Sequence, residues 1–326
     1  MNIDRAGPIL CFGEVLLRLS TAPGARLANA QSLAVHVGGA EANVGAMLAQ
    51  LGRRVEMVTV LPRSALGDQC EAEIRRAGVG TTGIRRANGR MGLYFAEGTA
   101  GSGRILYDRE SSAFSANADA FDWSELARDA SWFHLSGINL ALGGKPADAA
   151  LTAVKAMAEA AVPISFDVNH RASLWEGRSK ADVDRVIQVI GMADVLFASP
   201  DDLIRLGLHH GDPAKAAFSA FDSLNVIAST RRSVERQQLS ARVETREEAY
   251  ETEAAPLGQV FDRIGSGDAF AGAVIDAVLR GASLKETATI GLAAAVMKHG
   301  NVGDLWIGTR EELEAFDPFA PGDIRR

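Results

Sequence analysis

The 326-residue sequence is poor in the residues that build metal centres and disulfide frameworks. Its two cysteines, Cys11 and Cys70, lie far apart and form no CxxC pair, which disfavours zinc-ribbon, thioredoxin-like and disulfide-scaffold proteins. We expect both thiols to be buried and unreactive. The six histidines form no HExxH motif and no i, i+4 pair, so a zinc site is disfavoured as well.

Positive net charge and long apolar segments are also missing. The 34 Lys and Arg residues against 41 Asp and Glu residues give a formal net charge of −7, so no global positive field favours nucleic acid. No apolar stretch approaches the roughly 20 residues that cross a bilayer, and the first residues show no signal-peptide pattern. We therefore expect a cytoplasmic protein without a nucleic-acid or membrane partner. A local arginine cluster can still bind an anionic small molecule.

The sequence does contain the alternation of short apolar strands and helices that is typical of α/β folds. Its composition is that of a globular protein, 47% hydrophobic and 23% charged. Helical spacing predicts helices at 41–51, 146–161 and 271–278. Strands are predicted at 9–12, 55–60, 132–135, 164–168, 195–198 and 226–229. Near-continuous apolar strands between helices indicate a mainly parallel sheet that is covered on both faces.

Two segments, 15–37 and 84–114, interrupt this alternation. Both contain short alternating runs, and the second also contains a glycine-rich turn at 98–103. This pattern predicts antiparallel hairpins, which we expect to form a small β lid. Exposed strand edges in such a layer favour a homodimer that forms through the lid. The α/β core then comprises residues 1–14, 38–83 and 115–326.

The loop Asp262-Arg263-Ile264-Gly265-Ser266-Gly267-Asp268 carries the strongest chemical signal, because it lies between an apolar segment and a helical pattern. Gly265 and Gly267 allow a tight turn whose N–H groups, together with those of the helix N-terminus, can hold a phosphoryl group. Asp268 in the first helical turn can accept a proton from an attacking hydroxyl. The alternative is a plain turn in which Asp268 only complements the helix dipole.

A second glycine loop, Gly38-Gly39-Ala40-Glu41-Ala42-Asn43, also precedes a helical pattern. Its paired glycines let a ligand approach the backbone closely, and the Asn43 amide offers donors and an acceptor. A simple turn with a local bond from Asn43 is the alternative. The other glycine segments, Gly144-Lys145-Pro146 and Gly101-Ser102-Gly103, do not complete a Walker A loop or a dinucleotide fingerprint. A dinucleotide oxidoreductase is therefore disfavoured.

These two loops, in this order, resemble the signatures of the ribokinase-like (PfkB) carbohydrate kinase family, and the resemblance spans nearly the whole chain. It implies a three-layer α/β sandwich with a mainly parallel central sheet and a small β lid. It also implies ATP as the phosphoryl donor, with Mg²⁺ or another divalent cation. Asp268 is then the catalytic base, beside a cup formed by Gly265, Ser266 and Gly267. The residue after Asp262 is commonly Thr in this family and is Arg263 here.

Four further segments resemble those of 2-keto-3-deoxygluconate kinases within the family. Three of them are Tyr107-Asp108-Arg109 with Ser111-Ser112-Ala113, Asp167-Val168-Asn169-His170-Arg171, and Lys298-His299-Gly300-Asn301-Val302-Gly303-Asp304. The fourth, Ser199-Pro200-Asp201-Asp202, stands in the place of the family's Asn-x-x-Glu motif. By this resemblance Asp202 is a metal residue that acts through water. Planar arginine forks suit a sugar carboxylate, which makes Arg109 and Arg171 candidates for that contact.

The resemblance also implies which residues surround the sugar and which surround the nucleotide. The sugar-side residues are Gly38, Gly39, Asn43, Tyr94, Tyr107, Arg109 and Arg171. The nucleotide-side residues are Asn169, Ser199, Thr230, Arg231, Gly265, Gly267, Ala295 and His299. Plainer alternatives stay open for some of them: an exposed hairpin charge for Arg109, packing for Tyr94, a surface turn for Thr230 and Arg231, and simple core for Ala295.

The function predicted from this resemblance is ATP-dependent phosphorylation of a sugar acid at its primary hydroxyl. The expected reaction converts 2-keto-3-deoxygluconate to 2-keto-3-deoxy-6-phosphogluconate. A fructokinase, a ribokinase or a nucleoside kinase shares the two glycine signatures and is the alternative within the family. A non-catalytic sugar- or nucleotide-binding protein is the alternative from another class, and Asp268 beside an intact glycine loop disfavours it.

Overall fold

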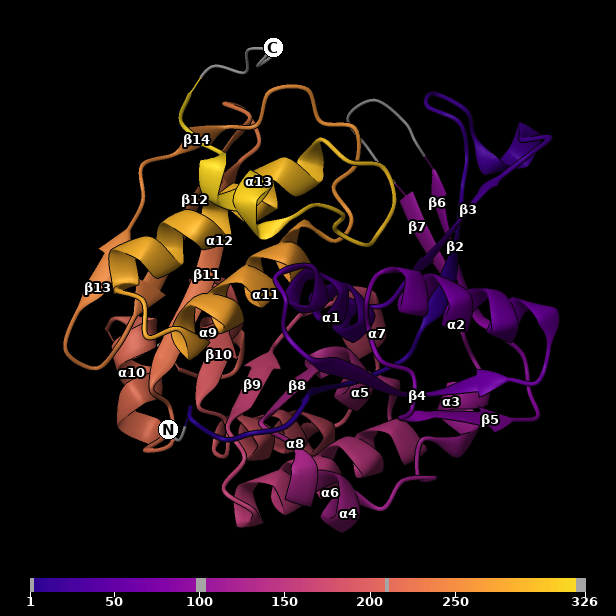
Figure 1. Ribbon diagram of the computed structural model, residues 1–326, viewed down its shortest axis with the longest axis horizontal. Coiled ribbons are helices and arrows are strands. Elements are labelled where there is room, and N and C mark those ends of the chain that lie inside the picture. Colours follow the sequence, from indigo (N-terminus) through magenta and orange to yellow (C-terminus); the bar gives the residue numbers. More distant parts are fainter. Residues whose placement is uncertain (1–2, 98–103, 209–210, 321–326) are drawn as a thin grey trace.

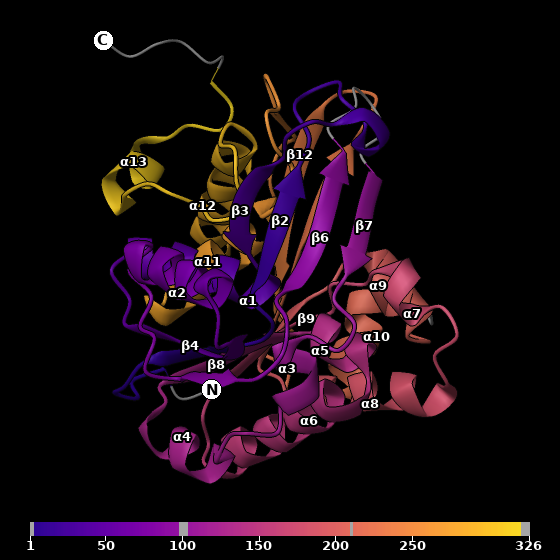
Figure 2. The same cartoon turned by 90° about the vertical axis from the view of Figure 1, so that its right-hand side faces the viewer.

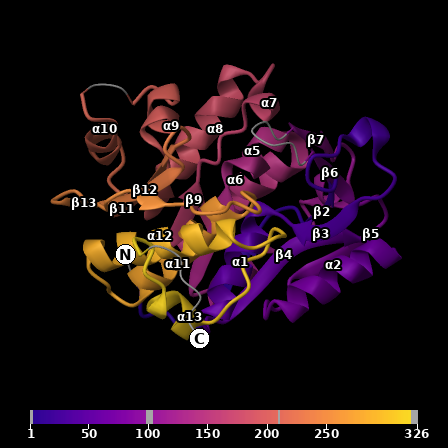
Figure 3. The ribbon, with the colours of Figure 1, turned by 90° about the horizontal axis from the view of Figure 1, so that it is seen from above.

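The computed structural model describes residues 3–97, 104–208 and 211–320, and within them a large sheet lies between two layers of helices (Figures 1 and 3). The strand order of this sheet is β13-β12-β11-β10-β9-β8-β1-β4-β5, and β14 pairs with β12. Its strands are β1 (Ile9–Phe12), β4 (Val55–Pro62), β5 (Ile84–Ala87), β8 (Trp132–Ser136), β9 (Ile164–Asp167), β10 (Val195–Phe197), β11 (Val226–Ser233), β12 (Gln238–Glu244), β13 (Ala249–Glu251) and β14 (Ala255–Pro256).

The predicted mainly parallel sheet is confirmed. The pairs from β5 through β4, β1, β8, β9 and β10 to β11 are all parallel. The strands after β11 pair antiparallel and extend the sheet at one edge, which the sequence analysis did not predict. β12 alternates polar and apolar residues, and β13 and β14 are only three and two residues long, so none of them has the continuous apolar run of a buried parallel strand.

The helices divide between the two faces because successive strand residues point to opposite sides. Ile9 and Cys11 of β1 belong to one hydrophobic cluster, and Leu10 and Phe12 belong to the other. The first face carries α1 (Ala40–Gln50), α2 (Ala65–Arg76), α11 (Ser266–Leu279), α12 (Leu284–His299) and α13 (Arg310–Ala315). The second face carries α3 (Ala113–Asn117), α4 (Trp123–Asp129), α5 (Gly137–Leu142), α6 (Gly144–Glu159), α7 (Ala172–Trp175), α8 (Lys180–Ile190), α9 (Pro200–Arg205) and α10 (Pro213–Ala220).

A second, smaller sheet stands over one end of the large sheet (Figure 2). Its order is β3 (Ala34–Gly38), β2 (Leu16–Ser20), β6 (Gly92–Glu97) and β7 (Arg104–Asp108), and a short 3-10 helix, η1 (Leu27–Asn29), lies between β2 and β3. The predicted antiparallel pairing of β6 with β7 is present, whereas β2 and β6 pair in parallel. The predicted turn at 98–103 lies outside the described residues. One boundary differs from the prediction, because β5 pairs with β4 in the large sheet and not with the small one.

The structure also places the two cysteines and bears on membrane-spanning helices. Cys11 and Cys70 are both free and fully buried, as predicted. Across residues 3–97, 104–208 and 211–320, no helix is both long and apolar enough to span a membrane.

Helices α1 and α11 cross closely, and each follows one of the two glycine loops. A methyl group at Gly272 of α11 would lie 2.7 Å from Cβ and Cγ of Met47 in α1, so a side chain at this position does not fit without movement. The close crossing therefore brings the N-terminal turns of the two helices, and with them Asn43 and Asp268, next to each other.

We expect Gly272→Ala to lower the free energy of unfolding by about 1–3 kcal/mol, because the new methyl group overpacks the α1–α11 contact. Chemical denaturation measures this change. The matched control is Gly45→Ala in α1, where a methyl group would find ordinary contacts of 3.4 Å to Val55 and 3.5 Å to Cys11. The control should be unchanged or more stable by up to about 1 kcal/mol. Equal destabilisation of both variants would contradict the close crossing.

Candidate active site

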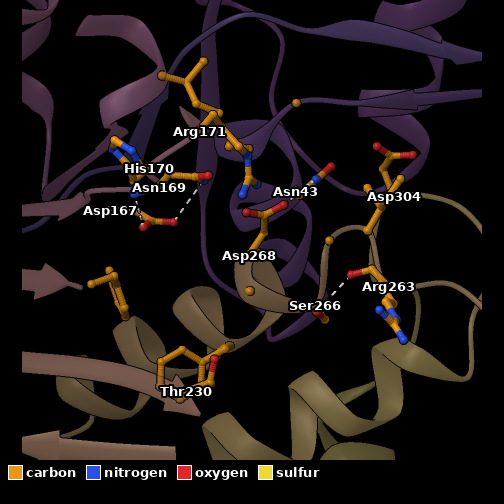
Figure 4. Close-up of a pocket in the computed structure, with 18 of the residues that line it drawn as sticks. Asn43, Asp167, Asn169, His170, Arg171, Thr230, Arg263, Ser266, Asp268 and Asp304 are labelled. Atoms are coloured by element: carbon orange, nitrogen blue, oxygen red, sulfur yellow. Dashed lines mark hydrogen bonds between the residues drawn. The ribbon is translucent and has the colours of Figure 1, made fainter. Parts of the chain in front are cut away.

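A cleft of about 780 Å³ lies between the small sheet and the carboxyl ends of the parallel strands of the large sheet (Figure 4). Ligands bind at this end of open α/β sheets. The residues predicted from the sequence that line the cleft are Gly39, Asn43, Tyr94, Tyr107, Arg109, Asn169, Arg171, Ser199, Asp202, Thr230, Gly265, Ser266, Gly267 and Asp268. The predicted residues that do not line it are Gly38, Arg231, Ala295 and His299.

The glycine loop at the start of α11 forms a backbone cup in the cleft wall. Gly265 has φ of 83°, and a Cβ built there would lie 2.1 Å from the carbonyl oxygen of Asp304, so only glycine fits. The helix begins at Ser266, whose N–H donates to the Arg263 carbonyl at 3.4 Å, whereas the N–H groups of Gly267 and Asp268 have no acceptor within the described chain. The Ser266 hydroxyl donates to the Arg263 carbonyl at 3.0 Å and stabilises the turn. The remaining donors and the positive end of the helix dipole suit a phosphoryl group.

Asp268 lies in the first turn of α11 with only 9% of its surface exposed. The Asn43 Nδ2 donates to its Oδ2 at 2.6 Å, and no other described residue donates to the carboxylate. Burial raises the pKa of Asp268 to about 6, although the Asn43 hydrogen bond and the nearby Arg171 guanidinium favour the ionised form. A carboxylate with this pKa is largely ionised at neutral pH and is still basic enough to accept a proton.

The glycine loop before α1 sets the opposite wall of the cleft. Gly39 caps the helix with φ of 147°, and a Cβ there would lie 2.3 Å from the Glu14 carbonyl oxygen. At Gly38 a Cβ would overlap the Asp304 carboxylate, so a side chain there would have to displace that carboxylate. The buried Oδ1 of Asn43 has no partner among the described residues. It is therefore an acceptor that a ligand hydroxyl in the cleft can satisfy.

The segment after β9 places one arginine and one strained asparagine at the cleft. Asn169 adopts a left-handed conformation with φ of 42°, and both its N–H and its Nδ2 donate to Asp167, at 2.9 Å and 3.2 Å. Burial, with the Asp268 charge second, raises the pKa of Asp167 to about 7. Arg171 is exposed in the cleft, points toward Asp268, and forms no ion pair with any described residue (Figure 4). Its guanidinium is free to bind an anion.

Arg109 of the small sheet is not the exposed hairpin charge that the sequence left open. It is only 6% exposed, and its Nε and Nη2 lie 2.7 Å and 2.5 Å from Oε2 of Glu14. The other Glu14 oxygen accepts a short hydrogen bond from the Ser112 hydroxyl. The Arg109 guanidinium also lies over the Tyr107 ring, 5.8 Å from its centre. Glu14 thus fixes the arginine and leaves Nη1 without a protein partner in the described chain.

Two tyrosines complete the wall that the small sheet contributes. The rings of Tyr94 and Tyr107 pack against each other with their centres 5.8 Å apart. The Tyr94 hydroxyl donates a short hydrogen bond to Oδ2 of Asp304. Tyr94 is therefore both a packing residue and a lining residue, and its polar atom is already engaged.

The segments after β10 and β11 supply the other end of the cleft. Ser199 and Asp202 form a reciprocal cap of α9, in which Oδ2 of Asp202 accepts from the Ser199 N–H at 3.0 Å and from its hydroxyl at 2.6 Å. Thr230 lines the cleft, whereas the Arg231 side chain is 72% exposed beside Glu251 in a neighbouring depression. Within the described residues, no group of three or more His, Cys, Asp or Glu side chains could hold a metal ion by itself.

Two predicted nucleotide residues lie inside the protein. Ala295 packs in the hydrophobic core, which is the plainer alternative that the sequence left open. His299 is buried at the end of α12, where Nδ1 donates to the Ala295 carbonyl at 2.6 Å and the other ring nitrogen contacts Arg232. Burial lowers the pKa of His299 to about 4, so the ring is neutral.

Three residues that shape the site were not singled out from the sequence: Glu14, Arg18 and Glu41. Glu41 is buried and accepts hydrogen bonds from the Ser136 N–H at 2.9 Å and from Asn139 at 2.9 Å, which joins the start of α1 to the end of β8. Each of the three is a charged residue in a segment that is otherwise largely apolar or small. That is the signal that could have found them, since buried charges need partners.

Comparison with known proteins gives a consistent result. The sequence pattern of the "pfkB family carbohydrate kinase" matches residues 8–305. A 2-dehydro-3-deoxygalactonokinase from Haloferax volcanii is 30% identical over 315 residues, which cover 94% of this chain and 95% of that one.

Solved structures show the same fold. A 2-dehydro-3-deoxygluconokinase from Thermotoga maritima is 34% identical, with a TM-score of 0.86 over 95% of this chain and 97% of that one. A fructokinase from Xylella fastidiosa with bound ATP is 23% identical, with a TM-score of 0.75 over 91% and 93% of the two chains, a likeness of fold alone. With the sequence match covering nearly the whole chain, this protein belongs to the pfkB family of carbohydrate kinases.

Proposed function

We propose that this carbohydrate kinase transfers the γ-phosphoryl group of ATP to the terminal hydroxyl of a sugar acid, with 2-keto-3-deoxygluconate as the substrate. The observation that carries the proposal is the position of Asp268. A buried carboxylate with one engaged oxygen lies beside a backbone cup for a phosphoryl group, and arginines line the same cleft. The names of the relatives from Haloferax volcanii and Thermotoga maritima support a 2-keto-3-deoxy sugar acid as the substrate class.

In the proposed reaction, Asp268 orients the terminal hydroxyl and accepts its proton. The hydroxyl oxygen forms a bond to the γ-phosphorus as the bond from that phosphorus to the β–γ bridging oxygen breaks, and ADP leaves. The first-turn N–H groups after Gly265 stabilise the charge on the transferring group. Base and cup belong to the same helix turn, so their relative position is set before the substrates bind.

The carboxylate end of the substrate lies, in this proposal, at Arg171 and Arg109. Arg171 has no ion pair within the described chain, and Arg109 keeps Nη1 available while Glu14 fixes its plane. An arginine that is held in place forms a directional hydrogen bond at a lower entropic cost. The unpartnered Oδ1 of Asn43 and the backbone at Gly39 then bind hydroxyls of the sugar chain.

ATP lies along the other end of the cleft in this proposal, near Asn169, Ser199, Thr230, Arg263 and the Gly265 cup. The fructokinase of similar fold that was solved with bound ATP supports this nucleotide. The nucleotide contacts of Arg231, Ala295 and His299 stay predictions, and none of the three residues lines the cleft. Asp202 fits a Mg²⁺ ion held mainly by phosphates and water, because its Oδ1 has only a 3.5 Å contact with Arg205. When bound, the ion would neutralise phosphate charge.

The small sheet acts as a lid in this proposal, because phosphoryl transfer needs water to be excluded. We also propose that its outer face joins two chains. Val35, Leu19, Phe95 and Leu106 form an apolar row across all four strands, on the face opposite Tyr94 and Tyr107. Val35 is 46% and Leu106 is 50% exposed in the single chain. A second copy that covers this row would remove apolar surface from water.

An assay of ADP release with a panel of acceptors tests the proposed function. The panel contains 2-keto-3-deoxygluconate, its galactose-derived epimer, fructose, ribose and a nucleoside. The proposal predicts the highest kcat/KM for 2-keto-3-deoxygluconate, and a preference for its epimer would contradict the named substrate but keep the sugar-acid class. Preference for fructose, ribose or a nucleoside would contradict the proposed substrate class. Tight ligand binding without any phosphoryl transfer would contradict the proposed kinase activity.

Asp268 must be ionised to act as the base, so kcat/KM should fall as the pH drops through about 6. The Asn43→Ala variant should move this acid limb to higher pH, because it removes the hydrogen bond that favours the ionised form.

Asp268→Asn should lower kcat by about 10²- to 10⁴-fold and leave ATP binding intact. The matched control is Asp184→Asn on the exposed side of α8. Near-normal turnover of Asp268→Asn would contradict the proposal that Asp268 is the base.

Arg171→Ala should raise KM for sugar acids by about 10- to 100-fold, because one charge-assisted hydrogen bond is lost. Steady-state kinetics with a sugar acid and with fructose measure the difference. Arg171 tests this contact more cleanly than Arg109, since Arg109→Ala would also leave Glu14 buried and unpaired. Equal losses for the acid and for fructose would show that Arg171 does not bind the carboxylate.

Sedimentation equilibrium at micromolar concentration should find a dimer. Leu106→Glu should produce monomers, because it places a charge in the apolar row. Leu66→Glu on α2, where the leucine is 46% exposed, is the matched control and should stay dimeric. A wild-type protein that is monomeric at this concentration, or equal effects of the two variants, would contradict the proposed interface.

A further inference from the structure

A buried ionic cluster joins the small sheet to the loops around the phosphate cup. We call it the Arg18 cluster, and its members are Arg18 and Tyr94 from the small sheet with Asp262, Lys298 and Asp304 from the C-terminal part of the chain. The Nη2 of Arg18 donates to Oδ2 of Asp262 at 2.6 Å, and its Nε lies 3.0 Å from Oδ1 of Asp304. The Arg18 side chain is 2% exposed. One guanidinium therefore pairs with two carboxylates from different loops, with a hydrogen bond to Asp262 and an ion pair without a hydrogen bond to Asp304.

Asp262 transmits this contact to the phosphate loop, which begins at this residue. Its Oδ1 accepts a hydrogen bond from the Ile264 N–H at 3.0 Å, which shapes the turn that leads to Gly265. Its Oδ2 also accepts from the Gly303 N–H at 3.1 Å. Although burial acts in the opposite direction, the Arg18 guanidinium holds the pKa of Asp262 below its ordinary value. Asp262 is thus an ionised hub between Arg18 and the cup.

Asp304 brings the second loop against the same cup. Its carbonyl oxygen packs on Gly265 so closely that no Cβ fits between them. Its carboxylate accepts the short hydrogen bond from the Tyr94 hydroxyl, and Tyr94 lines the sugar end of the cleft. Lys298 fixes the approach to Asp304, because its ammonium donates to the carbonyls of Asn301 at 3.0 Å and Gly303 at 2.7 Å.

The composition of the cluster argues for a role beyond stability. Two positive charges face two negative charges in the protein interior, and desolvation of such groups often cancels the energy that their attraction supplies. Apolar residues of similar volume often stabilise a buried site as well as an ion pair does. What the charged bridge adds is geometry, because the planar guanidinium fixes the direction of its hydrogen bond to Asp262 and holds the Asp304 carboxylate beside β2 by charge.

We propose that Arg18 is a positioning residue that holds the phosphate loop, residues 262–268, in a fixed position relative to the sugar-binding face of the small sheet. The residues that contact the sugar and the residues that receive the phosphoryl group then form one unit. Arg18 acts through Asp262 and Asp304 and need not contact either substrate. The inference rests on the proposed function only in taking the Gly265 cup as the place of phosphoryl transfer.

A second ionic cluster on α11 provides the matched control. Asp276, near the other end of this helix, is buried and pairs with Arg53 at 2.6 Å, Arg280 at 3.0 Å and Arg310 at 2.9 Å. These residues do not line the cleft. Arg53→Met therefore removes one of the three arginine partners of a buried carboxylate on the same helix without touching the phosphate loop.

The experiment compares Arg18→Met with Arg53→Met by kinetics, thermal unfolding and amide hydrogen exchange. Both variants should lower Tm. Only Arg18→Met should lower kcat, by about 100-fold, because a small displacement of reacting groups has effects of this size. KM for both substrates should stay within about threefold, since Arg18 contacts neither. Exchange of the Ile264 and Gly303 amides, both bonded to Asp262, should be faster in Arg18→Met alone.

Arg18→Lys tests the positioning role of Arg18 if Arg18→Met fails to fold. It keeps the charge balance and should fold, but one ammonium cannot reproduce the two-pronged bridge, so kcat should lie between those of the wild type and Arg18→Met. Wild-type kcat and exchange in Arg18→Lys, or in a folded Arg18→Met, would overturn the inference and leave Arg18 a purely structural role. The exchange measurement needs no substrate. A protein that phosphorylates no sugar acid would therefore refute the proposed function while exchange still tests Arg18.

Discussion

The hydrogen bond from Asn43 to Asp268 is the contact on which the rest of the site depends. It joins the first turns of α1 and α11, which approach closely because Gly272 has no side chain to keep Met47 away. The bond occupies one carboxylate oxygen and favours ionisation, while burial opposes ionisation and raises the pKa to about 6. The balance leaves a carboxylate that is charged near neutrality and still basic. Because the Gly265 cup begins the same helix, the base and the backbone site that binds the phosphoryl group belong to one helix turn.

The arginines in and near the cleft differ in whether they are paired with carboxylates of the protein. Arg109 is held by Glu14 and Arg18 is held between Asp262 and Asp304, so carboxylates of the protein fix the orientation of both guanidiniums. Arg171, in contrast, has no ion-pair partner in the part of the chain that the structure describes, and it influences both Asp167 and Asp268 by its charge. A chain whose net charge is −7 can therefore present local positive charge to an anionic ligand, since a cleft concentrates the field of the groups that line it.

The sequence predicted the parts of this structure that depend on local patterns. Continuous apolar runs such as Ile9–Phe12 indicated the parallel strands, and the two glycine loops indicated where the backbone approaches a ligand. It missed β12, whose alternating residues contain no continuous apolar run, and β13 and β14, which are only three and two residues long. It assigned β5 to the wrong sheet, because strand partners are chosen by long-range pairing. The roles of Glu14, Arg18 and Glu41 were hidden for the same reason. Each is defined by partners that are distant in the chain, such as Asp262 for Arg18, and periodicity carries no information on such pairs.

The central claim is that the Asp268 carboxylate meets the terminal alcohol of a sugar acid at the cup that receives the phosphoryl group. A crystal structure with 2-keto-3-deoxygluconate and a non-hydrolysable ATP analogue tests it most directly. The account predicts the terminal hydroxyl oxygen within about 2.6–3.2 Å of the free Asp268 oxygen and the γ-phosphate against the backbone after Gly265. A complex in which that hydroxyl points away from Asp268, or in which the γ-phosphate lies elsewhere in the cleft, would contradict it.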